Sequence, residues 1–128
     1  MENNLVLSTF IKQLDECFEE VSKQYDADTR FIKCRLYYDT MKKANPRLII
    51  TVWKSMVTDK YDKQISSGDI GYFLEKDYSE DVPDLYNSTV DSSIQELRIA
   101  VRGMSDENKG VTLKYFQNLC KLSKLYVY

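Results

Sequence analysis

Residues 7–25 read LSTFIKQLDECFEEVSKQY, and their pattern is the clearest indication of the fold class. The apolar side chains of this stretch recur at steps of three and four residues: Leu7, Phe10, Ile11, Leu14, Cys17, Phe18, Val21 and Tyr25. Such spacing places them in one narrow sector of an α-helix. Charged side chains, most of them acidic, fill much of the remainder. We therefore predict a helix with one buried face and one solvated acidic face.

Helical patterns continue on both sides of Asn45-Pro46, a pair in which asparagine can cap a helix and proline can begin one. We expect helices at about 29–43, 46–58, 69–74, 88–102 and 106–125, with a polar loop or single turn at 59–68 and a long acidic connection at about 75–87. No strand pattern competes except at residues 125–128, which could extend along a neighbouring chain. The sequence thus predicts an all-α fold. We expect one compact domain over residues 1–128. This domain is a bundle of five to six helices, with front helices at about 5–74 and back helices at about 88–125.

The expected helix at 29–43 has apolar residues on two sides. One stripe consists of Phe31, Cys34, Tyr38 and Met41. Ile32 and Leu36 lie together on a different side. Either this helix is central to the bundle or its second face meets a partner, and the pattern favours a central position, because buried helices are apolar all round.

The charges of the chain alternate in sign by blocks. The net charge is about −5 over residues 1–29, about +6 over 30–60, about −7 over 69–96 and about +4 over 98–128. The overall net charge of −2 therefore conceals strong local fields. Such fields govern association rather than fold.

Residue types and spacings argue against catalysis and against bound metal or cofactor. The chain has no histidine, which removes the commonest general base and the commonest zinc ligand. Its three cysteines are far apart in sequence and odd in number, which favours buried core thiols in a reducing compartment. Residues 77–81 resemble half of a calcium loop, but Val82 replaces the required glycine. Since glycine-rich phosphate motifs are also lacking, we expect no enzyme, no metal and no cofactor.

Two charged segments are the candidate partner-binding sites. The first is a basic corner made by Lys42, Lys43, Arg47 and Lys54, with Tyr37 and Tyr38 as nearby stacking candidates. The second is the acidic connection, whose candidate residues are Asp77, Tyr78, Glu80, Asp81, Asp84 and Tyr86. The basic corner could contact phosphates, be an ordinary solvated surface, or pair with acidic segments of the protein itself. A dedicated nucleic-acid domain is usually strongly basic, whereas this chain has a pI near 5.2.

Two stretches carry a resemblance. One begins Asn45-Pro46-Arg47-Leu48-Ile49-Ile50 and runs through Trp53-Lys54 to Phe73-Leu74-Glu75-Lys76-Asp77-Tyr78. The other is residues 114–126, KYFQNLCKLSKLY. Together they resemble small helical proteins encoded by large double-stranded DNA viruses of algae and amoebae, over about half of the chain. The resemblance implies a virus-encoded protein and a minor virion component, and it carries over no functional residue.

These observations predict a non-enzymatic structural or interaction protein whose complementary charged surfaces contact protein partners, either copies of itself or a capsid protein. The alternative is a nucleic-acid-binding accessory protein that uses the same basic corner. The longest apolar runs are far too short for a membrane span, and the N-terminal residues lack the features of a secretory signal. We expect a protein of the virion or host cytoplasm if it is viral, otherwise cytoplasmic or nuclear and not secreted, with no small-molecule substrate.

Overall fold

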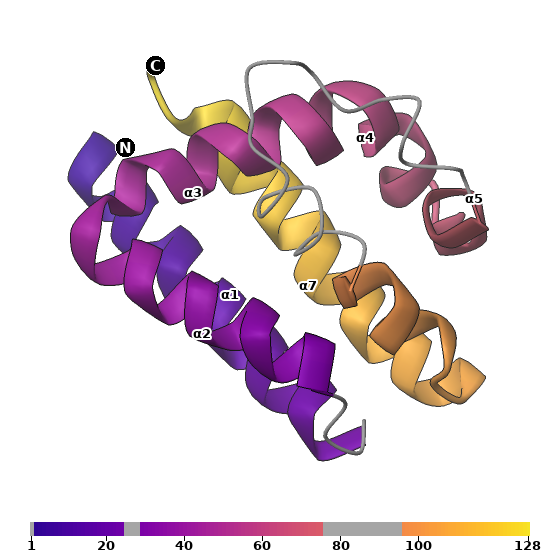
Figure 1. Ribbon diagram of the computed structural model, residues 1–128. Coiled ribbons are helices and arrows are strands. Elements are labelled where there is room, and N and C mark those ends of the chain that lie inside the picture. Colours follow the sequence, from indigo (N-terminus) through magenta and orange to yellow (C-terminus); the bar gives the residue numbers. More distant parts are fainter. Residues whose placement is uncertain (1, 25–28, 76–95) are drawn as a thin grey trace.

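Two helices from opposite ends of the chain, α1 (Asn3–Gln24) and α7 (Asp106–Leu125), pair along their length in the computed structural model (Figure 1). The structure describes residues 2–24, 29–75 and 96–128. The two helices run antiparallel: Asn3 bonds to Val127 near one end, and Gln13 accepts a hydrogen bond from Asn118 further along. Both helices agree with the sequence prediction, because each buries one apolar stripe against the other.

Against this pair lie α2 (Thr29–Ala44), α3 (Pro46–Trp53) and α4 (Asp59–Ser66), and the short helix α5 (Ile70–Glu75) contacts α4. A π-helical turn, Lys54–Thr58, joins α3 to α4 without a break. Residues 96–102 are also helical, in agreement with the end of the helix predicted at 88–102. No strand occurs within the three described ranges. The predicted all-α fold is confirmed.

The polar loop or single turn predicted at 59–68 is wrong, since most of this stretch is the helix α4. Its Tyr61 and Ile65 are buried one turn apart, while the polar residues between them form the solvated side. The helix ends at Ser66, and Gly68 follows two residues later with a φ of +93°, a left-handed conformation suited to glycine. The Asp69 N–H then donates to the Gln64 carbonyl at 2.8 Å, which closes the end of the helix.

Side-chain caps are found at two helix starts. Asp69 Oδ1 accepts a hydrogen bond from the Tyr72 N–H at 3.2 Å, and Ser105 Oγ accepts one from Asn108 at 3.3 Å. Asn45 occupies the position before α3 but makes no side-chain cap bond, so Pro46 alone provides the predicted start. At each of these two caps, the side-chain oxygen accepts a hydrogen bond from a backbone N–H that has no partner within the helix.

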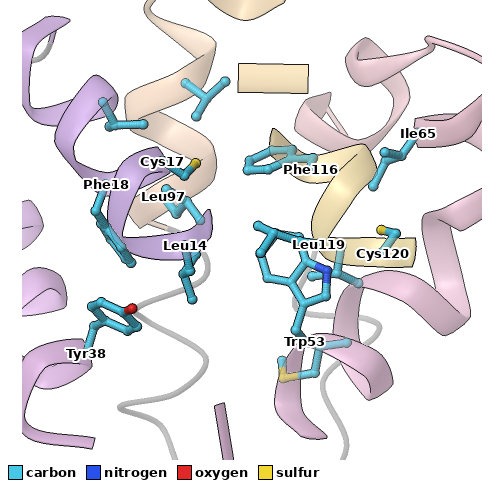
Figure 2. Packing of buried hydrophobic residues seen from close by; sticks show 14 of the residues in the cluster. Leu14, Cys17, Phe18, Tyr38, Trp53, Ile65, Leu97, Phe116, Leu119 and Cys120 are labelled. Atoms are coloured by element: carbon cyan, nitrogen blue, oxygen red, sulfur yellow. The ribbon is translucent and has the colours of Figure 1, made fainter. Parts of the chain in front are cut away.

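Trp53 lies at the centre of the core. Its ring meets those of Phe10 and Phe116 edge to face, with centroid distances of 6.2 and 5.4 Å. Figure 2 shows Trp53 beside Phe116 and Cys120, with the Phe18 and Tyr38 rings in the part of the core formed by α1 and α2. The three cysteines are all buried and free, as their prediction as core residues required. Burial raises the pKa of the Cys17 thiol to about 12.

The central position favoured for α2 is wrong. Its Cys34 and Tyr38 are buried, but Ile32 and Leu36 on the other side are 44% and 59% exposed. The second apolar face of this helix therefore faces outward from the described part of the bundle. The other possibility left open by the sequence, that this face meets a partner, is the one consistent with its exposure.

The closing residues, which could have extended along a neighbouring chain, lie against their own chain. The Asn3 side chain donates to the Val127 carbonyl at 2.8 Å and accepts from the Val127 N–H at 2.9 Å. The Tyr128 hydroxyl donates to the Ser123 carbonyl at 2.8 Å. Both polar backbone groups of Val127 are thus already bonded within the chain.

Candidate interaction site

The basic corner surrounds the turn between α2 and α3. Lys42 and Lys43 are in the last turn of α2, Arg47 is in the first turn of α3, and Lys54 begins the π-helical turn. The corner is thus positioned by Pro46, which begins a new helix directly after the turn. The structure brings three of the four predicted basic residues to one corner and places Lys54 at the other end of α3.

Lys42 is engaged with acidic groups of its own chain. Its Nζ lies 3.0 Å from Asp15 Oδ1 on α1 and 3.9 Å from Asp39 Oδ1 on α2. The same ammonium lies 5.4 Å from the centre of the Tyr38 ring. For this lysine, the structure agrees with the possibility that basic and acidic segments of one chain pair with each other.

Lys42 belongs to a layered cluster that joins α1 to α2. The Tyr38 ring stacks on Phe18 at a centroid distance of 4.7 Å, and the Arg35 guanidinium lies over the Phe18 ring, 5.5 Å from its centroid. Arg35 also reaches Glu19 Oε1 at 2.8 Å. Cations placed over aromatic rings are attracted by the ring quadrupole. The acidic face of α1 is therefore partly neutralised by the basic residues of α2.

Tyr38 is the polar link in this cluster. Its hydroxyl donates to Asp15 Oδ1 at 2.7 Å. Burial and this bond to a carboxylate raise the pKa of Tyr38 well above its ordinary value. Since its ring is stacked on Phe18, Tyr38 is not open to stack on a nucleotide base, and Tyr37 is packed against the core. The sequence suggested both tyrosines as stacking candidates, and the structure removes that role for Tyr38.

Lys54 is also paired, with Asp59 one turn further along. Lys43 and Arg47 differ from Lys42 and Lys54. Both are exposed, and neither takes part in an ion pair among residues 2–24, 29–75 and 96–128. Of the four predicted basic residues, these two are the ones that have no ion pair within the described part of the chain.

We call Ile32, Leu36, Lys43 and Arg47 the outer face. Ile32 and Leu36 are one helical turn apart, and Lys43 follows Leu36 by two turns, so the three share one side of α2. Arg47 lies just past the corner, at the start of α3. The outer face therefore combines two exposed apolar side chains with two cations that form no ion pair with any described residue. Ile32 and Leu36 were visible in the sequence as a second apolar stripe, but their exposure was not.

The acidic half of the predicted site lies outside the described residues. This applies to Asp77, Tyr78, Glu80, Asp81, Asp84 and Tyr86. Their role in binding a partner stays a prediction.

Two hollows mark the described surface. An apolar cavity of about 100 Å³ lies between α1, α2 and α3, with Phe18, Cys34, Met41, Val52 and Leu97 among its lining. A polar pocket of about 350 Å³ lies where the π-helical turn and α4 meet the end of α7, and four lysines line it. Because the sequence predicted a polar loop or single turn at 59–68, it did not predict that Lys60, Lys63 and Lys124 gather around Lys54. The spacing of three residues between Lys60 and Lys63 is the feature of the sequence that would place both lysines on one side of a helix.

Within the described ranges, no group of three or more histidine, cysteine, aspartate or glutamate residues is placed to hold a metal ion. None of the helices in that part of the chain is both long enough and apolar enough to cross a bilayer. Comparison with protein-family models, with curated proteins and with solved structures gave no match.

Proposed function

We propose that this chain is a non-enzymatic interaction protein and that its outer face binds a second copy of the same chain. The observation that carries the proposal is the exposure of Ile32 and Leu36 near Lys43 and Arg47, which have no ion-pair partner in residues 2–24, 29–75 or 96–128. An apolar centre with a charged rim is the usual anatomy of a protein–protein contact. Complementary charges then set the orientation and the choice of partner.

A second copy is the favoured partner because the chain carries the complementary charge itself. Residues 75–87 contain one lysine and five acidic residues. By contrast, the carboxylates of α1 nearest the corner are already engaged, Asp15 by Lys42 and Glu19 by Arg35. The proposed contact pairs the outer face of one copy with the acidic candidates Asp77, Glu80, Asp81 and Asp84 of another, with Tyr78 and Tyr86 beside them.

The virion role implied by the sequence resemblance belongs to the same proposal. A protein that associates through charged surfaces could add to a capsid as a minor component, with a capsid protein presenting a similarly acidic surface. Such contacts are screened by salt, because the Debye length is only about 8 Å at physiological ionic strength. Salt sensitivity is therefore the property to test first.

The test is light scattering after size exclusion at low salt and at about 0.5 M salt. We expect an assembly larger than a monomer at low salt that dissociates at high salt. The double variant Lys43→Glu/Arg47→Glu should be monomeric at both. The matched control is Lys114→Glu/Lys121→Glu, which makes the same charge change at two exposed lysines of α7. A wild-type chain that is monomeric at every salt concentration would overturn the proposal.

The apolar part of the outer face needs its own variant. Leu36→Ser should weaken association at low salt, whereas Leu125→Ser should not, although Leu125 is 54% exposed and so closely matched. Equal effects of the two substitutions would show that exposed leucines matter only through general solubility. In that case the outer face would have no special role.

Nucleic acid is the second candidate, favoured by the same two cations, Lys43 and Arg47. Phosphate contacts by lysine and arginine need no particular base sequence. The loss of Tyr38 as a stacking residue weakens this candidate. Adding a short DNA or RNA duplex to the same experiment distinguishes the two. A monomer that shifts only with the duplex, and loses the shift in Lys43→Glu/Arg47→Glu, would support nucleic-acid binding over self-association.

A further inference from the structure

The polar pocket at the π-helical turn lies away from the outer face and is lined by residues of three elements. They are Lys54 and Thr58 of the turn, Asp59, Lys60, Asp62 and Lys63 of α4, and Lys124 of α7. Its volume of about 350 Å³ falls within the range of small-molecule sites. We call it the lysine pocket.

The charges around the lysine pocket do not cancel. Lys54 pairs with Asp59, and Lys124 Nζ lies 2.8 Å from Asp62 Oδ2. Lys60 and Lys63 take part in no ion pair with the described residues, so the lining carries four ammonium groups against two carboxylates. The surplus is two positive charges. Because residues three apart on a helix are neighbours, these two ammonium groups repel each other unless an anion lies between them.

The ion pairs of Lys54 and Lys124 hold these two lysines at the pocket and leave them able to contact a ligand. Asp62 accepts from Lys124 and also from Ser66 Oγ at 3.0 Å, so its carboxylate fixes the lysine at the pocket edge. The hydrogen bond from Lys124 lowers the pKa of Asp62, which indicates that its surroundings favour negative charge. Each ammonium has three donors, and a single carboxylate oxygen leaves others available to a ligand.

Hydrogen bonds join Thr58 of the lysine pocket to α7. Thr58 is buried, and its hydroxyl lies 2.7 Å from Ser123 Oγ on α7. Ser123 in turn donates to the Cys120 carbonyl at 2.8 Å. This bond chain fixes the π-helical turn against the end of α7, and Lys124 directly follows Ser123. π-helical turns inside helices occur frequently at functional sites.

From these observations we infer that the lysine pocket binds a small multivalent phosphate anion, a diphosphate group being the chemistry that fits. Lys60 and Lys63 are its main contacts, and Lys54 and Lys124 flank it. Several donors that line one pocket from different elements suit an anion with many acceptor oxygens better than a single carboxylate. The diphosphate could be free or part of a nucleotide. This inference does not depend on the proposed self-association.

The experiment is isothermal titration of the whole protein with inorganic pyrophosphate and, separately, with ADP, at constant ionic strength. We expect saturable one-site binding that Lys60→Gln/Lys63→Gln weakens by about tenfold or more. The control Lys114→Gln/Lys121→Gln removes the same charge from exposed α7 lysines and should change the affinity by less than about twofold. Circular dichroism checks that both double variants remain folded.

The outcomes separate the sources and can overturn the inference. Tighter binding of ADP than of pyrophosphate would assign the ligand to a nucleotide, and equal or weaker binding would assign it to a free diphosphate. No saturable binding of either anion, or equal loss in the two double variants, would overturn the lysine pocket as a site. Binding of a DNA duplex that depends on Lys60 and Lys63, without binding of pyrophosphate or ADP, would also overturn it.

Discussion

The hydroxyl of Tyr38 on α2 donates a hydrogen bond of 2.7 Å to Asp15 Oδ1 on α1, and the same oxygen lies 3.0 Å from Lys42 Nζ. One carboxylate thus connects a tyrosine and a lysine of α2 to α1. We predict that Tyr38→Phe lowers the free energy of unfolding by about 1–2 kcal/mol, because it removes a hydrogen bond to a charged acceptor. Urea denaturation followed by circular dichroism measures the effect. Tyr37→Phe is the control and should be close to neutral.

The buried hydroxyls of Thr58 and Ser123 form a pair whose energy can be isolated. Thr58→Val keeps the shape of the side chain but leaves Ser123 without this partner, and we expect a loss of about 1 kcal/mol in the free energy of unfolding. Ser123→Ala should cost a similar amount or more, since it also removes the bond to Cys120. In a double-mutant cycle the losses should be less than additive. Full additivity would mean that the two hydroxyls do not interact.

Ile65 tests whether α4 is packed as a core helix. It is fully buried, and we predict that Ile65→Ala lowers the free energy of unfolding by about 2–5 kcal/mol. The exposed Lys63 gives a control on the same helix, and Lys63→Ala should change stability by less than about 0.5 kcal/mol. If Ile65→Ala and Lys63→Ala had similarly small effects on stability, residues 59–66 would behave as a loop. That result would contradict the packing of α4 against the core.

The ion pair of Asp62 with Lys124 predicts a pH dependence. The hydrogen bond from Lys124 lowers the pKa of Asp62 in the folded protein below its ordinary value of 3.8. The unfolded chain therefore binds the proton more readily, so this contribution to stability is present above about pH 4 and is lost as the pH falls through the lowered pKa. Asp62→Asn should flatten the acid limb of the stability–pH profile. Lys124→Met should do the same, and an unchanged acid limb in both variants would refute the assignment.

The cysteines should be unreactive in the folded protein. All three are buried, and burial raises the pKa of Cys17 to about 12, so its reactive thiolate is scarce at neutral pH. We expect an Ellman assay to detect almost no thiol in the native state and all three after denaturation. Rapid reaction of a native thiol would show that the core opens near that cysteine.

Much of the fold could be predicted because, in long amphipathic helices, the spacing of the apolar residues identifies the buried face. The stripe from Phe10 to Val21 and the cap at Ser105 are local signals, and the structure contains both. The helix α4 was missed for a physical reason. Its buried Tyr61 and Ile65 follow Met56 and Val57 of the π-helical turn, so the apolar spacing departs from the α-helical period where this turn joins α4.

The candidate site was predictable only in part. The alternation of charge along the sequence indicates that α1 and α2 attract each other, but it does not identify which lysines are used. Lys42 reaches Asp15 because both project toward the α1–α2 contact, whereas Lys43, one residue later, points about 100° away and stays exposed. Whether a lysine pairs within the chain therefore depends on the direction in which its side chain projects from the helix. That direction, relative to the acidic residues of other helices, is set only when the bundle is assembled.

The π-helical turn at Lys54–Thr58 also sets the rotational phase of everything that follows it on the same helix. One additional residue in a helix rotates the following residues by about 100° around its axis. Without that rotation, Tyr61 and Ile65 would point away from the core, and Lys60 and Lys63 would no longer face the end of α7. A single-residue deletion within this turn would therefore move the lysines and the core residues of α4 together. The stability of this helix and the placement of its positive charge share one geometric origin.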